Sequence, residues 1–163
     1  MEAANRGAVD AGGRTIGLNI GLPFEQRPNA YLSEDLTFEF HYFFMRKLWF
    51  AHLARAIVVF PGGFGTLDEL FEILTLRQTH KIDRKICIVL YGSTFWKEVI
   101  NFDALVRQGV VSPQDIELFQ YADDPQTALH ILQREMELGA PQDRPSIAKS
   151  VTPCCAARDD DSA

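Results

Sequence analysis

The residues best suited to chemistry stand in one glycine-rich stretch, Pro61-Gly62-Gly63-Phe64-Gly65-Thr66, which is followed by the acids Asp68 and Glu69. A short β-branched run over 56–60 precedes it, and apolar residues recur at helical spacing over 67–74. A strand that turns through glycines into a helix aims backbone N–H groups and the positive end of the helix dipole at an anion. Because glycine carries no Cβ, a ligand can approach the backbone closely. The stretch therefore predicts a phosphate site.

A purely structural interpretation fits the same residues. Residues 66–69 also form a capping-box pattern, in which the Glu69 carboxylate reaches back to the Thr66 N–H. The spacing is not that of a P-loop, because no Lys follows the last glycine, nor is it the G-x-G-x-x-G dinucleotide fingerprint. The local pattern alone leaves a phosphate site and a tight, capped turn both open.

Residues 61–69 match the signature PGGxGTxxE and thereby resemble the LONELY GUY family, long labelled lysine decarboxylase-like. Members of that family are nucleoside 5′-monophosphate phosphoribohydrolases, which cut the N-glycosidic bond of AMP or of cytokinin riboside monophosphates. Met45-Arg46-Lys47 and the stretches 1–8 and 17–25 are also similar to the family. The resemblance covers about residues 1–138 and favours the phosphate interpretation.

The resemblance implies roles for individual residues. Arg46 and Glu69 correspond to the catalytic pair: a carboxylate can stabilise positive charge on the ribose ring, and a guanidinium can grip phosphate or ribose oxygens. The residues implied to bind substrate are Lys47, Pro61, Gly62, Gly63, Gly65 and Thr66. Water is the co-substrate, and we expect no metal and no cofactor. The structural alternatives are a helix cap for Glu69 and a salt bridge to a neighbouring acid for Arg46.

Three further polar residues are weaker candidates. Glu72 follows Glu69 by three positions on the same helix face and either supports the site or is solvated. Glu2 and Asn5 lie in a stretch that in relatives follows a second glycine loop, GGGPG. Because no such loop precedes Met1, we expect the first strands of the fold to be missing, which would remove one wall of the ligand crevice and expose a sheet edge.

Hydrophobic periodicity predicts the elements that position these residues. Strands are expected over 15–20, 36–40, 56–60, 85–91 and 117–122, and helices over 2–11, 42–54, 66–77, 93–108 and 125–138. This alternation predicts parallel βαβ units and an α/β fold of three layers, which the resemblance makes a Rossmann-like fold with a mostly parallel sheet. Helix 42–54 is apolar almost all round and needs cover, either from the domain itself or from a second subunit, as the family's dimers imply. Ser93 or Thr94 is expected to cap helix 93–108.

Composition limits the setting of the protein. The 163 residues are 47% hydrophobic, which suits one globular domain over 1–138, and residues 139–163 read as a disordered tail. A net charge of −6 without a basic stripe argues against a nucleic-acid partner, and no apolar run approaches the ~20 residues of a membrane span. Three cysteines without a disulfide pattern predict a cytoplasmic protein.

Two functions follow as hypotheses. The first is hydrolysis of a purine nucleoside 5′-monophosphate, AMP or a cytokinin riboside 5′-monophosphate, to the free base and ribose 5-phosphate by a homodimer. The alternative is a non-catalytic nucleotide-binding module or an inactive truncated remnant. The joint presence of Arg46 and Glu69 favours the first hypothesis, and the expected loss of the first strands favours the second.

Overall fold

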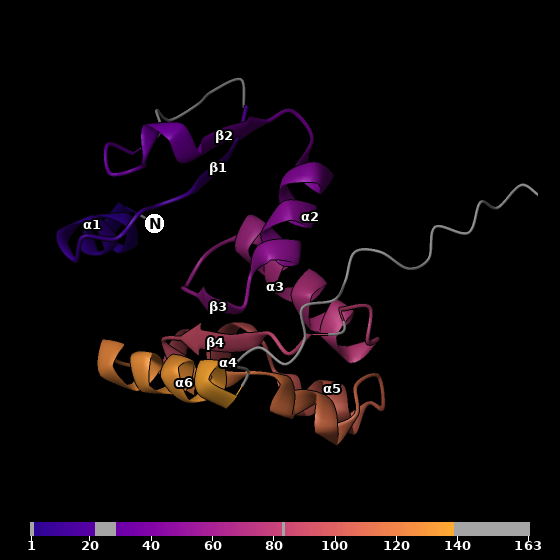
Figure 1. Cartoon of the computed structure of the whole chain (residues 1–163). Coiled ribbons are helices and arrows are strands. Elements are labelled where there is room, and N and C mark those ends of the chain that lie inside the picture. The colour runs from indigo at the N-terminus through magenta and orange to yellow at the C-terminus, as the bar shows by residue number, and fades with distance from the viewer. Residues whose placement is uncertain (1, 22–28, 83, 139–163) are drawn as a thin grey trace, which may run out of the picture.

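A computed structural model describes residues 2–21, 29–82 and 84–138 (Figure 1). The α-helices in these ranges are α1 (Glu2–Asp10), α2 (Phe43–Leu53), α3 (Phe64–Gln78), α4 (Ser93–Val99), α5 (Phe102–Arg107) and α6 (Pro125–Leu138). The strands are β1 (Gly17–Ile20), β2 (Thr37–Phe40), β3 (Ala56–Val59), β4 (Cys87–Tyr91) and β5 (Gln120–Ala122), and two 3₁₀ helices are η1 (Glu34–Leu36) and η2 (Pro113–Leu118). The predicted tail, 139–163, lies outside the described residues.

The sheet is parallel throughout the described residues but consists of two pieces. β3, β4 and β5 pair in sequence order, and β1 pairs with β2. In Figure 1, α2 leads from the β1–β2 sheet to β3. The predicted fold class, α/β and Rossmann-like, is confirmed. Within the described chain, one edge of β1 and one edge of β3 carry no neighbouring strand.

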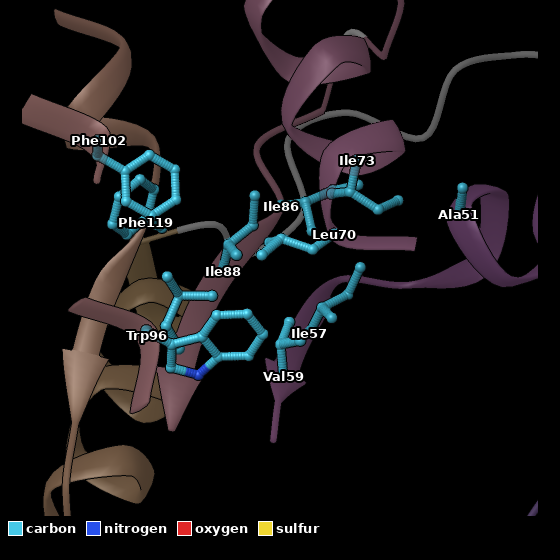
Figure 2. Close-up of a cluster of buried hydrophobic side chains, with 11 residues drawn as sticks. Ala51, Ile57, Val59, Leu70, Ile73, Ile86, Ile88, Trp96, Phe102 and Phe119 are labelled. Atoms are coloured by element: carbon cyan, nitrogen blue, oxygen red, sulfur yellow. The ribbon is translucent and has the colours of Figure 1, made fainter. Parts of the chain in front are cut away.

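Side chains of β3 and β4 alternate between two apolar clusters, one on each face of the sheet. The sheet and the helices that cover its two faces form the three layers. Ile57, Val59, Ile88 and Leu90 face the cluster that contains Leu70 and Ile73 of α3 and Trp96 of α4 (Figure 2). Cys87 and Val89 face the other side, where Ala128 and Ile131 of α6 cover them. A strand buried on both faces reads as a continuous apolar run, as expected for a parallel sheet between helices. The core therefore holds the carboxyl ends of β3 and β4 side by side.

The predicted helix over 93–108 is wrong, because the structure has two helices there. The chain leaves the helical conformation at Ile100, and the Asn101 side chain accepts a hydrogen bond of 2.8 Å from the Ala104 N–H, which starts α5. The predicted cap is wrong as well. Gly92, at φ +86°, precedes α4, and the Asp123 carboxylate after β5 accepts hydrogen bonds from both the N–H and the hydroxyl of Ser93. A side chain beyond the next strand thus supplies the capping acceptor.

Helix α2 is only sparsely covered by the described part of the chain. Ala51 is its buried residue, whereas large apolar side chains on it are 45% to 64% exposed: Phe43, Phe44, Leu48, Trp49 and Leu53. The cover that the sequence requires is therefore not supplied by the described residues of one chain. No helix among the described residues is long and apolar enough to cross a membrane.

Candidate functional site

The glycine turn joins β3 to α3 at the carboxyl edge of the sheet. α3 begins at Phe64, two residues before the predicted start, and Gly63 is its N-cap. The first intrahelical hydrogen bond runs from the Leu67 N–H to the Gly63 carbonyl at 3.0 Å. The backbone N–H groups before Leu67 therefore have no partner within the helix. Gly63 has no side chain to cap the helix, and Thr66 lies within its first turn. The capping-box interpretation of residues 66–69 is therefore wrong, and the turn keeps the donors that an anion needs.

The three glycines of the turn lie in two different environments. A Cβ on Gly62 would stand 2.2 Å from the Thr66 hydroxyl oxygen and 2.8 Å from the Thr66 Cβ, so the first turn of α3 closes directly over this residue. A Cβ on Gly63 or Gly65 would meet nothing within 4 Å. The side of the turn that these two glycines form is thus open. It has the room and the donors for a small anion.

Pro61 fixes the turn against the neighbouring strand end. A Cβ on Gly92 would lie 3.4 Å from the Pro61 Cγ, and Gly92 has the left-handed φ that favours glycine. Phe64, the variable position of the signature, is 92% exposed and does not pack. Sequence reasoning missed the Gly92–Ser93–Asp123 arrangement next to this turn, although a glycine directly after a buried strand is a visible signal.

The predicted catalytic residues lie together. Nη2 of Arg46 on α2 is 2.8 Å from Oε1 of Glu69 on α3, and the two side chains are 22% and 31% exposed. The Arg46 guanidinium also lies 6.0 Å from the centre of the Phe43 ring, and its Nε is buried without a hydrogen-bond partner among the described residues. The acid that pairs with Arg46 is thus the other predicted catalytic residue. The pair is partly open to solvent and can accept a ligand.

Lys47 forms a second bridge between the same helices. Its Nζ lies 2.9 Å from Oδ2 of Asp68 and 2.9 Å from Oε2 of Glu72. Lys47 donates hydrogen bonds to the carboxylates of Asp68 and then of Glu72, and these bonds raise the pKa of Lys47 above its ordinary value. Glu72, left open between support and solvation, pairs with Lys47, and its supporting role stays a prediction. The interpretation of Lys47 as a substrate-binding residue stays a prediction.

Two open depressions accompany α3. One of about 350 Å³ lies beside the Lys47 bridge and is lined by Lys47, Asp68, Phe71, Glu72, Thr75 and Leu76. A larger one, of about 480 Å³, lies at the far end of α3 between Gln78 and Asp115 and contains no predicted site residue. Glu2 and Asn5 lie in α1, and no hydrogen bond or ion pair joins them to the glycine turn in the described residues. The candidate site is therefore the first two turns of α3 with the facing residues of α2.

Comparison with known proteins identifies the family of this chain. A family model described as "Possible lysine decarboxylase" matches residues 1–132. The match spans most of the chain, so the protein belongs to this family, the LONELY GUY family indicated by the glycine signature.

Curated relatives carry one recurrent name. A "Cytokinin riboside 5'-monophosphate phosphoribohydrolase" of Rhodococcoides fascians is 29% identical over 116 residues, which are 69% of this chain and 57% of the relative. A protein of the same type from Arabidopsis thaliana is 38% identical over 69 residues, 42% of this chain and 31% of the relative. A probable one from Oryza sativa is 29% identical over 119 residues and 46% of its own length. The matched part of this chain thus spans 31% to 57% of the length of these relatives.

Proposed function

We propose that this chain is a nucleoside 5′-monophosphate phosphoribohydrolase, which hydrolyses the N-glycosidic bond of a cytokinin riboside 5′-monophosphate or of AMP. The products are the free base and ribose 5-phosphate. The observation that carries the proposal is the 2.8 Å contact between Arg46 and Glu69 beside an uncapped, open glycine turn. The printed names of the relatives support the reaction class, and AMP is the simplest substrate of that class.

In this proposal, the phosphate binds at the N–H groups of Gly62, Gly63, Gly65 and Thr66, where the dipole of the 15-residue helix α3 favours negative charge. Pro61 lies beside Gly92, at the end of the neighbouring strand, and belongs to the binding turn. Arg46, which is always charged, holds a phosphate or ribose oxygen with one edge of its guanidinium and keeps Glu69 on the other. Phosphate binding thus anchors the ribose next to the carboxylate.

Glu69 then acts at the anomeric carbon. The bond between that carbon and the base nitrogen breaks, and its electron pair leaves with the base, which takes up a proton. The Glu69 carboxylate stabilises the positive charge that develops on the ribose ring and orients the water whose oxygen bonds to the anomeric carbon. The proton released by this water balances the one taken up by the base. No step in this scheme uses a metal or a cofactor.

A second candidate is a nucleotide-binding module without catalysis. It is favoured by the free edges of β1 and β3 in the described residues, because a parallel sheet binds its ligand where the carboxyl ends of neighbouring strands form a crevice. A crevice with an open wall can bind a phosphate at the glycine turn and still admit too much water to stabilise a developing charge.

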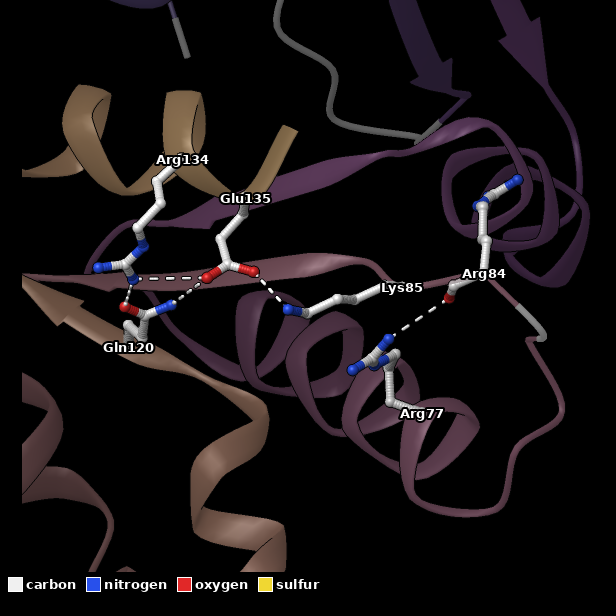
Figure 3. Close-up of polar contacts among 6 residues, drawn as sticks. All are labelled: Arg77, Arg84, Lys85, Gln120, Arg134 and Glu135. Carbon is white, nitrogen blue, oxygen red and sulfur yellow. Dashed lines mark hydrogen bonds and ion pairs between the residues drawn. The ribbon is translucent and has the colours of Figure 1, made fainter. Parts of the chain in front are cut away.

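One assay separates the two candidates. Purified protein is incubated with AMP and with an N6-substituted adenosine 5′-monophosphate, and the free base is quantified by chromatography. We expect the wild-type protein to release the base and the variants Glu69→Gln and Arg46→Ala to lose this activity. Adenosine, which lacks the phosphate, should not be a substrate. Binding of AMP without release favours the module. A charge-removing control away from the site is Lys85→Met, whose ion pair with Glu135 lies at the amino end of β4 (Figure 3).

We further propose that the protein is a cytoplasmic homodimer. Large apolar side chains cover much of α2, and a second copy of the chain could cover them by the same face on both subunits. Cys87 is a free, buried thiol whose pKa is raised by burial, and a reduced structural cysteine fits the cytoplasm.

A further inference from the structure

We propose that Lys47, Asp68 and Glu72 form a clamp between α2 and α3 that positions Arg46 and Glu69, so that Lys47 serves the reaction without touching the substrate. This inference rests on the proposed function. It assigns positioning roles to Asp68 and Glu72 and changes the role predicted for Lys47 from binding to positioning.

The clamp uses neighbouring residues on both helices. Arg46 and Lys47 are consecutive on α2, and about 100° separates their side chains around the helix. Arg46 reaches Glu69 at 2.8 Å, while Lys47 reaches Asp68 and Glu72, one turn apart on α3, at 2.9 Å each. Two polar bridges therefore run side by side between the helices. Any movement of α2 that breaks one of them also strains the other.

Apolar packing gives α2 little support of its own. Ala51 is the buried residue of α2, and Phe50 is partly buried against the same core cluster. At its other end, α2 is held by the Arg84 guanidinium, which donates a 2.7 Å hydrogen bond to the Ala51 carbonyl. α2 also contacts β1 and β2, whereas its position relative to α3 at the site is held by the two polar bridges. Catalysis is sensitive to such orientation, since a misplacement of 1 Å can cost about 100-fold in rate.

Charge argues against direct contact between Lys47 and a phosphate. The Lys47 side chain is 18% exposed, and its ammonium group pairs with two carboxylates. A dianionic phosphate that approached Lys47 would meet the negative charges of Asp68 and Glu72 at the same place. The glycine turn offers N–H donors that carry no paired carboxylate, and Arg46 is paired with one acid, whereas Lys47 is paired with two. Lys47 is therefore better suited to bind α3 than to bind substrate.

The test compares variants that remove the acids with one that removes the lysine, in the full chain with AMP as substrate. If the clamp positions the catalytic pair, the double variant Asp68→Asn/Glu72→Gln and the variant Lys47→Met both lose kcat by about 10-fold or more with little change in KM. The exchanged pair Lys47→Glu/Glu72→Lys should regain part of that loss. The control Lys85→Met removes an ion pair of 2.6 Å elsewhere and should keep the wild-type kcat.

Direct substrate binding by Lys47 predicts the opposite pattern. Freeing the lysine in Asp68→Asn/Glu72→Gln would lower KM and keep kcat, and Lys47→Met would raise KM alone; either result overturns the clamp. If the wild-type chain releases no base, the proposed function fails, and the clamp is then tested with ribose 5-phosphate. Weaker binding by the acid double variant, through a displaced Arg46, supports the clamp, whereas unchanged or tighter binding overturns it.

Discussion

Nη2 of Arg46 and Oε1 of Glu69 lie 2.8 Å apart and join α2 to the first turns of α3. Each charge is balanced by the other, so neither of these partly buried groups is left unpaired. Both side chains also keep some exposure, which lets a ligand reach them. A phosphate or ribose oxygen can therefore approach the Arg46 guanidinium without leaving either charge of the pair buried and unpaired.

We expect Arg46→Lys to lose most of the activity although it keeps the charge. An ammonium group is a point charge and cannot hold Glu69 and a substrate oxygen along two edges, as a planar guanidinium can. The expected loss in kcat/KM for AMP is about 10-fold or more, measured by steady-state base release. Wild-type kinetics in Arg46→Lys would show that the fork of the guanidinium has no role.

Local sequence patterns predicted most elements, because the apolar period is a property of the segment itself. The predicted helix 125–138 coincides with α6, and strand 56–60 differs from β3 by one residue. The same patterns missed the break between α4 and α5 at residues 100–101. Apolar residues continue at helical spacing across this break, so the period does not show that a new helix begins after the Asn101 cap. They also missed η2, which shortened the strand predicted over 117–122.

The candidate site was predictable in its residues and not in its contacts. The signature identified Glu69 and the glycines, and the pair on α2 identified Arg46 and Lys47. Which acid meets which cation depends on how α2 docks on α3, and a one-dimensional pattern holds no information about that. The capping box of residues 66–69 failed because α3 begins at Phe64, which places Thr66 inside the helix, and Glu69 pairs with Arg46.

We expect Gly62→Ala to destabilise the protein by about 1–3 kcal/mol. The added Cβ would lie 2.8 Å from the Thr66 Cβ, which no side-chain rotation can move, so the first turn of α3 must shift. The free energy of unfolding, from urea denaturation, measures this cost. The matched control is Gly63→Ala, which has a φ of −89° and no atom within 4 Å of its Cβ, and which should stay within about 0.5 kcal/mol of wild type. Equal costs for the two variants would contradict the close contact at Gly62.

The ionised Glu135 carboxylate makes a contribution to stability that is lost at acid pH. The hydrogen bond from Lys85 is the main cause that lowers the pKa of Glu135 below its ordinary value of 4.5, with a smaller part from Arg134 (Figure 3). A lowered pKa means that this contribution is present above about pH 4.5 and is lost as the pH falls through the pKa of the folded state.

We therefore expect Glu135→Gln to have a shallower decline of unfolding free energy than wild type as the pH falls from about 6 to 3. Lys85→Met should show the same change in slope, because it removes the partner that lowers the pKa. Denaturant titrations at several pH values measure both slopes. Curves parallel to that of wild type would mean that the bridge between Lys85 and Glu135 does not contribute in solution.

The exposed face of α2 tests the proposed dimer. Leu48 is 56% exposed on α2 among other apolar side chains, whereas Leu129 is 55% exposed on α6. An acid placed in an apolar interface must be buried without a partner, which is costly, but an acid on a solvated helix is not. In analytical ultracentrifugation we expect wild type and Leu129→Asp to sediment as dimers and Leu48→Asp as a monomer. A monomeric wild type, or a dimer that survives Leu48→Asp, would contradict assembly through α2.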